Sequence, residues 1–129
     1  MKLKASKFAP IAAVVAALLL GSASAYATQY SVTNLGSFGY GGSVAQGINS
    51  TGEVVGYSTN SAGNINAFLY SNGTMQNLGT FGGTTSLGRG INSTGEVVGH
   101  ATNSAGNTNA FLYSNGTMQN LGTLGALPA

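Results

Sequence analysis

The chain has 129 residues, of which only 5% are charged, and it contains no cysteine. Its formal net charge of +2 depends on three lysines near the N-terminus, Lys2, Lys4 and Lys7. Without them the chain keeps one arginine and two glutamates, for a net charge of −1. This composition excludes a basic patch for nucleic acid or anionic lipid, and the lack of cysteine excludes disulfides.

The first 27 residues have the layout of a secretory signal peptide. The three lysines precede an apolar run over residues 8–20, and small residues follow it. Cleavage is expected after Ala27, with Ala25 as the second matching site. The alternative is an uncleaved membrane anchor, but an apolar run of about 13 residues is shorter than the ~20 that span a bilayer. We therefore expect a secreted protein, periplasmic or extracellular, with no stable membrane anchor after cleavage.

A repeat occupies most of the remaining chain. Residues 48–83 recur as residues 91–126, offset by 43 positions and different at 5 of 36. A fixed period of this length indicates a repeat architecture. The predicted division is a signal peptide at 1–27, a leading strand and connection at 28–47, a first repeat unit at 48–90, and a second unit with a truncated end at 91–129.

Each repeat carries signals for short antiparallel strands. In the first copy, Asn72-Gly73 predicts a type I′ hairpin turn, and a turn at 49–52 precedes the first strand. Residues 30–36 align one period before 73–79, so the chain is expected to open with a lone final strand. The strands of the first repeat are predicted at 53–58, 67–70, 74–78 and 86–91.

Both faces of the predicted sheet are semi-apolar. Ala67 and Leu69 alternate with Phe68 and Tyr70, a pattern that suits packing by a neighbouring sheet on each side. A four-stranded unit of about 43 residues has the size of a β-propeller blade. We therefore predict an all-β fold of tandem antiparallel four-stranded units, propeller-blade-like, with two units plus one leading strand.

Two blades are too few to close a ring, which usually has four to eight. The predicted ring is therefore incomplete. The chain is then a truncated member of a longer array, one part of an assembly of several chains, or a small open stack of two sheets. In each case the sheets end in exposed edges, which favour self-association.

The repeated motifs resemble the bacterial extracellular HAF repeat. They read Asn-Leu-Gly-Thr-Phe-Gly-Gly, then Gly-Ile-Asn-Ser-Thr-Gly-Glu-Val-Val-Gly, then Asn-Ala-Phe-Leu-Tyr-Ser-Asn-Gly, and they cover residues 30–126. The chain departs from the family's His-Ala-Phe, because Asn66 and Asn109 stand in the place of the histidine. The resemblance implies an exported β-rich repeat protein of unestablished function, with no catalytic residues to carry over.

No catalytic residue, cofactor or metal is expected. Glu53 and Glu96 are the only carboxylate side chains, and both follow a turn at matched repeat positions. This favours a solvated residue at the start of a strand over the acid–base pair of a glycan hydrolase. His100 replaces Tyr57 of the other copy, and a catalytic base would not alternate with tyrosine. Two carboxylates and one histidine also make a poor metal site.

Tyrosine and asparagine side chains suggest a polar-aromatic binding surface. We expect a non-catalytic structural or protein-interaction module, whose partner is another copy or a cell-surface protein or glycan. The alternative is a secreted carbohydrate-binding module. The candidate ligand-binding residues are Tyr40, Tyr57, Tyr70, His100 and Tyr113.

Overall fold

The computed structural model of the chain describes residues 27–124. The compact unit that carries every strand of this range begins at Asn34, and residues 27–33 belong to a separate unit. The predicted signal peptide lies outside the described residues except for Ala27, and the same holds for the tail at 125–129. None of the described residues belongs to a helix that is long and apolar enough to cross a membrane.

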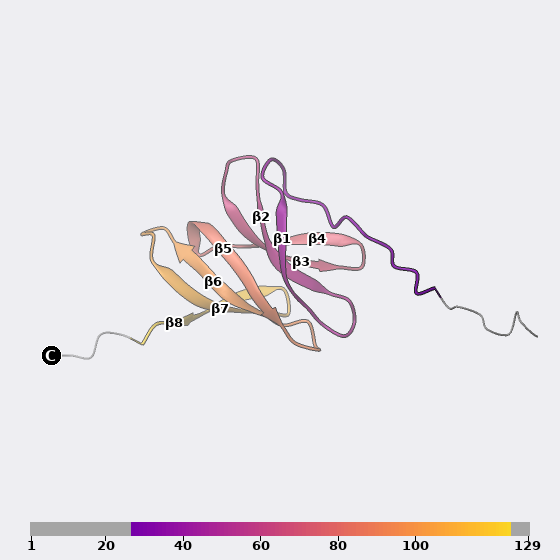
Figure 1. Ribbon diagram of the computed structural model, residues 1–129. Coiled ribbons are helices and arrows are strands. Elements are labelled where there is room, and N and C mark those ends of the chain that lie inside the picture. Colours follow the sequence, from indigo (N-terminus) through magenta and orange to yellow (C-terminus); the bar gives the residue numbers. More distant parts are fainter. Residues whose placement is uncertain (1–26, 125–129) are drawn as a thin grey trace, which may run out of the picture. The chain divides into compact units, whose positions relative to one another are not determined.

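The described residues form an all-β fold without helices, as predicted (Figure 1). Within each of two groups, the strands pair antiparallel in chain order. A single parallel pairing between Ile65 and Thr85 joins the groups into one open sheet. The first group contains β1 (Ser43–Ile48), β2 (Val54–Thr59), β3 (Ile65–Ser71) and β4 (Thr74–Gly79). The second group contains β5 (Gly82–Ile91), β6 (Val97–Asn103), β7 (Thr108–Ser114) and β8 (Thr117–Gly122).

The strands predicted for the first repeat correspond to β2, β3, β4 and β5, with bounds that differ by a few residues. The Asn72-Gly73 turn is also confirmed: both residues have positive φ, 51° and 79°, as a type I′ turn requires. It places Ser71 opposite Thr74, which sets the register of the β3–β4 hairpin.

Two features of the N-terminal region differ from the prediction. The leading strand expected over 30–36 is not formed, and β1 lies in the region predicted to be a connection. The equivalent of 30–36 in the next repeat is β4, which is a strand because it pairs with β3. The described residues before position 30 contain no strand that could serve as such a partner. A strand signal without a partner does not produce a strand.

Each group has two faces, because side chains alternate along a strand and directly paired residues share a side. Face A is the side that carries Phe68 and Tyr70 in the first group, and face B is the opposite side. On face A lie Val54, Phe68, Tyr70 and Met75 of the first group, and Val97, Phe111, Tyr113 and Met118 of the second. On face B lie Val55, Ala67, Leu69 and Leu78 of the first group, and Val98, Ala110, Leu112 and Leu121 of the second.

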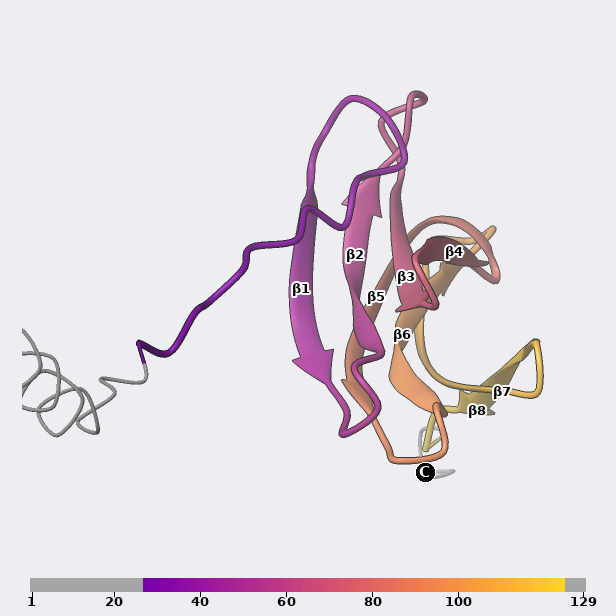
Figure 2. The ribbon, with the colours of Figure 1, turned by 90° about the vertical axis from the view of Figure 1, so that its right-hand side faces the viewer.

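The core lies where face B of the first group meets face A of the second. Figure 2 shows the two groups packed together, with β5 beside β3. Burial of apolar side chains is the main force that holds such a contact together. The buried residues of this core are Val55, Ala67, Leu69 and Leu78 from the first group, and Val97, Ala101, Phe111 and Tyr113 from the second.

Candidate functional site

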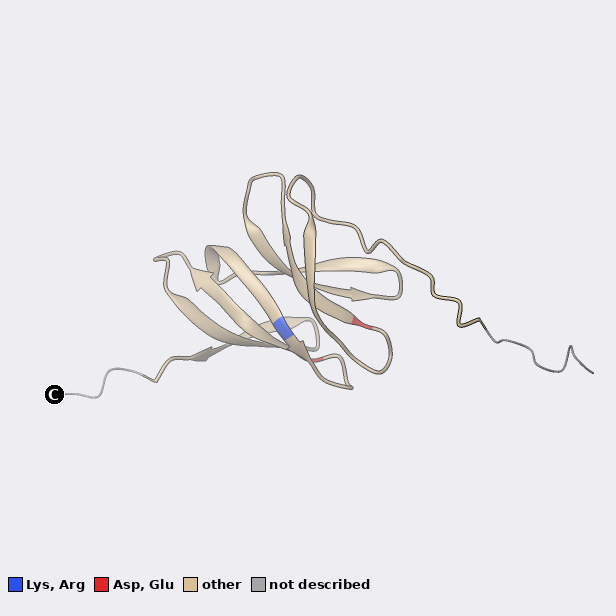
Figure 3. Cartoon of the chain, viewed as in Figure 1, with Lys and Arg blue, Asp and Glu red and all other residues tan. Residues whose placement is uncertain are grey.

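Charged side chains are scarce in the described part of the chain, which carries Arg89, Glu53 and Glu96 (Figure 3). Arg89 lies on β5 and donates a hydrogen bond to the side chain of Gln46 on β1, at 3.2 Å. The two glutamates are therefore the only acidic groups in this region that could support acid–base chemistry, and their surroundings decide whether they do.

Glu53 fixes the turn that precedes β2. Its carboxylate accepts hydrogen bonds from Asn49 Nδ2 at 2.6 Å, Thr51 Oγ1 at 3.3 Å and Ser71 Oγ at 3.1 Å. The Asn49 side-chain oxygen in turn accepts the backbone N–H groups of Thr51 and Glu53. The hydrogen bond from Asn49, followed by that from Ser71, holds the pKa of Glu53 below its ordinary value.

The second repeat contains the same network around Glu96. The carboxylate accepts from Asn92 Nδ2 at 2.6 Å, Thr94 Oγ1 at 3.4 Å and Ser114 Oγ at 3.0 Å. The Asn92 bond is again the main reason that the pKa of Glu96 is lowered. Each glutamate is half-buried and held by three side chains, rather than freely solvated as the sequence suggested. Their role in both copies is to tie the turn to the end of the third strand of the group.

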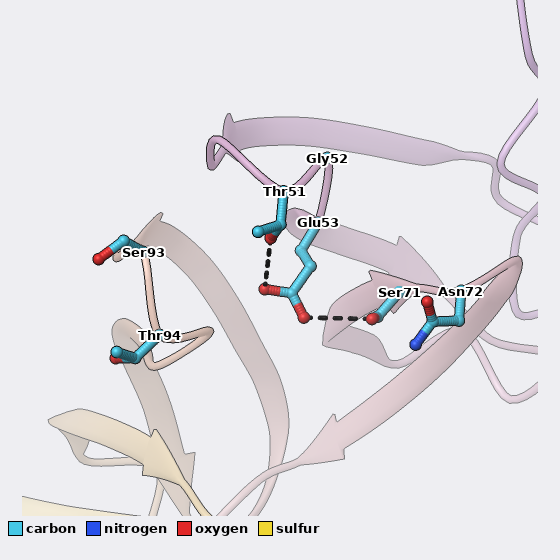
Figure 4. A pocket seen from close by; sticks show the side chains of 7 residues that line it. All are labelled: Thr51, Gly52, Glu53, Ser71, Asn72, Ser93 and Thr94. Carbon is cyan, nitrogen blue, oxygen red and sulfur yellow. Dashed lines mark hydrogen bonds between the residues drawn. The ribbon is translucent and has the colours of Figure 1, made fainter.

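Glu53 also lines an open polar hollow of about 330 Å³, which lies between the turn that precedes β2 and the turn that precedes β6 (Figure 4). Asn49 Nδ2 links these two turns by donating to the backbone oxygen of Asn92, at 3.0 Å. Glu53 is the only titratable residue of the lining, so the hollow has no second group for acid–base catalysis. The lining consists of Thr51, Gly52, Glu53, Ser71, Asn72, Ser93 and Thr94.

A metal centre has no donor set in the part of the chain that the structure describes. No three side chains of histidine, aspartate or glutamate come together there. Divalent cations such as Ca²⁺ need six to eight oxygen ligands, and Zn²⁺ needs several nitrogen, sulfur or carboxylate ligands.

The five candidate ligand-binding residues do not form one surface. Tyr40 lies in the turn before β1 and is 93% exposed. Tyr57 and His100 are half-buried at matched positions on face B of β2 and β6. Tyr70 and Tyr113 occupy matched positions on face A, where Tyr70 is half-buried and Tyr113 is buried between the groups.

Sequence reasoning missed two polar contacts between the groups. Gln76 Nε2 donates to the hydroxyl of Tyr113 at 2.7 Å. Ser86 Oγ accepts the backbone N–H of Ala67 at 2.8 Å and donates to the backbone oxygen of Gly79. Gln76 and Tyr113 are 37 positions apart, and Ala67 and Ser86 are 19 apart, so only the packing of the two repeats reveals these contacts.

Identical residues of the two repeats differ strongly in exposure on face B. Leu78 is 7% exposed and its equivalent Leu121 is 55% exposed. Val55 is fully buried, whereas Val98 is 47% exposed. Ala67 is buried and Ala110 is exposed. The second group therefore presents an uncovered apolar face, and this open face B is the best candidate for a functional surface.

No protein-family model, curated protein or solved structure matches the chain. The resemblance to the HAF repeat therefore remains a prediction from its motifs.

Proposed function

We propose that the protein is an exported structural or protein-interaction module that works through the apolar faces of its strand groups and performs no catalysis. The observation that carries this proposal is the open face B of the second group. Val98 and Leu121 are largely exposed there, although the same residues of the first group are buried. Contiguous apolar surface is uncommon on a soluble protein unless it binds something.

Two further observations favour a non-catalytic role. The carboxylate of each glutamate accepts three hydrogen bonds that hold a turn, and both repeats contain this network. A catalytic carboxylate needs a partner group and a substrate-sized site around it. Export is supported by the lysines, apolar run and small residues at the N-terminus.

We further propose that each group is a propeller-blade-like unit of an incomplete ring, related to the HAF repeat. Four strands paired in chain order, a period of 43 residues and face-to-face packing of successive groups support this proposal. The exposed faces of the two groups are then the surfaces through which the blades bind a partner.

Binding measurements test the proposed function. The full chain is expressed in a bacterial host, and its processed product is immobilised and exposed to envelope proteins and to the protein itself. We expect binding that Ala110→Lys on face B weakens by about tenfold or more, or about 1.4 kcal/mol. Ala105→Lys, in the exposed turn between β6 and β7, is the matched control and is expected to bind as the wild type does. A protein that binds neither would contradict the proposal.

Export is tested separately by mass spectrometry of the product outside the cytoplasm. The expected N-terminus follows cleavage after Ala27, with Ala25 as the alternative. An intact chain that remains in the cytoplasm would contradict export.

Carbohydrate binding is the second candidate function, and the high exposure of Tyr40 favours it. An exposed tyrosine ring offers a stacking surface for sugars. The test is a glycan array with the wild type and Tyr40→Ala. Binding that the variant loses supports this function, and an array without signal rejects it.

A further inference from the structure

We infer that the partner of the open face B is a second copy of this chain, docked head to tail through face A of its first group. This inference rests on the proposed function, because it names the partner of the same surface. The contact inside the chain, where face B of the first group meets face A of the second, is the template for the contact between chains.

The two surfaces needed for this junction are already present. The face B residues that build the internal core, Val55, Ala67, Leu69 and Leu78, have identical residues at the matched positions of the second group. Their copies, Val98, Ala110, Leu112 and Leu121, are all more exposed. The open face B of one chain therefore has the apolar composition of a face that packs against face A inside the chain.

The complementary face A of the first group is open in part: Phe68 and Ser58 are buried on it, but its margin along β1 is exposed. Ile48 is 69% exposed, whereas its equivalent Ile91 packs against the internal core. Ser43 is exposed, whereas its equivalent Ser86 is fully buried. The exposed face B of the second group and the exposed part of face A of the first group therefore correspond to the two surfaces that meet in the internal core.

The polar groups of the internal contact also have equivalents at the two ends. Gln119 occupies the position of Gln76, and Tyr70 that of Tyr113, so Gln119 of one chain would donate to the Tyr70 hydroxyl of the next. Ser43 already donates to the backbone oxygen of Gly36 at 2.6 Å, as Ser86 does to Gly79. Its oxygen is therefore oriented to accept the N–H of Ala110, as Ser86 accepts that of Ala67.

The segment before β1 has to move for this docking. Leu35 is the equivalent of Leu78 one period earlier, and it lines an apolar hollow beside Ile48 and Val54 on face A. Leu121 and Gly122 of the docking chain would take the places of Leu35 and Gly36, so docking displaces this segment of the accepting chain. The junction between chains is therefore expected to be weaker than the contact within the chain, and Leu35→Ser is expected to strengthen it.

A junction between two different surfaces is heterologous and repeats, so it produces either a closed ring or an open filament. Each chain supplies two blade-like groups. A closed ring of four to eight blades would therefore contain about two to four chains.

The test combines light scattering with complementation between two variants of the full chain. The wild type is expected to show a mass above that of one chain, 12.8 kDa before processing, and the mass should rise with concentration. Ala110→Lys blocks face B and Ser43→Lys blocks face A; both residues are exposed in the single chain, so the fold is expected to survive. Each variant alone should stay a single chain. An equimolar mixture should give a two-chain species, because one intact face of each kind remains.

The controls are Ala62→Lys and Ala105→Lys, which add the same charge in exposed turns. Both are expected to assemble like the wild type, and circular dichroism checks that every variant is folded. A wild type that stays a single chain up to about 1 mM, a concentration that populates even weak contacts, overturns the inference. So does a mixture of the two blocked variants that forms no two-chain species. If a protein that stays a single chain still binds envelope proteins, only the self-association is contradicted. If it binds nothing, the self-association and the proposed function are both contradicted.

Discussion

Gln76 on β4 donates a hydrogen bond of 2.7 Å to the hydroxyl of Tyr113, which lies on β7 of the other group. The tyrosine ring is buried in the core between the groups, and its hydroxyl accepts the bond from Gln76. This contact couples apolar packing to a directional bond and helps to set how the second group sits on the first.

Replacing Tyr113 by phenylalanine is expected to lower the free energy of unfolding by about 0.5–1.5 kcal/mol, because it removes this bond and keeps the packing of the ring. The measurement is urea unfolding at low protein concentration. Tyr70→Phe is the matched control, because Tyr70 occupies the same repeat position and no hydrogen bond to its hydroxyl is found in the described part of the chain. Equal losses in the two variants would contradict the role of the Gln76 bond.

The stability of the protein is expected to fall in acid because of its two glutamates. The folded state lowers the pKa of both Glu53 and Glu96. The stabilisation is therefore complete above the pKa of the unfolded carboxyl, about 4.3, and is lost as the pH falls through the lower pKa of the folded state. Urea midpoints should therefore decrease as the pH drops from about 6 to about 3.

The double variant Glu53→Gln/Glu96→Gln should lose most of this pH dependence, since no other acidic side chain exists in the sequence. Each single variant should keep about half of it, because the two networks are alike. An unchanged acid slope in the double variant would show that the networks do not stabilise the fold.

Glycine at position 56 is required by the close approach of β1. A Cβ atom added to Gly56 would overlap the backbone oxygen of Val44, and the neighbouring backbone cannot yield without breaking the pairing of the strands. Gly56→Ala is therefore expected to cost about 1–3 kcal/mol of stability or more.

Gly47, on β1, provides the comparison, because a Cβ atom there would meet its nearest neighbour, Val55 Cγ2, at an ordinary 3.4 Å. Gly47→Ala should be neutral or stabilise by about 0.4–1 kcal/mol through the lower entropy of the unfolded chain. Thermal unfolding of the two variants distinguishes them. Similar melting temperatures would contradict the steric argument.

The local features of the fold could be predicted from the sequence because they depend on neighbouring residues. Asn72-Gly73 selects its turn by its own backbone preferences, and the strands on either side follow from short β-branched and aromatic runs. The sequence over 30–36 has the same local signal as β4, but the prediction of a leading strand there was wrong. A strand depends on a partner, and local composition does not supply one.

The candidate site was harder to predict, for a related reason. Alternation along 67–70 correctly indicated two semi-apolar faces. It could not indicate which copy of each face is covered, because Leu78 and Leu121 lie in identical local sequences. Their exposure depends on which group stands next to them, and that is a property of the tertiary structure.

The same pair of leucines provides the most direct measure of the packing between the groups. Leu78→Ala removes a side chain that is buried in the core and is expected to cost about 2–5 kcal/mol. Leu121→Ala makes the same chemical change in the same local sequence, but that side chain is 55% exposed in the single chain. It should cost less than about 1 kcal/mol at low concentration, because little apolar area returns to water. Urea unfolding of both variants gives the difference, and equal losses would mean that face B of the first group is not covered by the second.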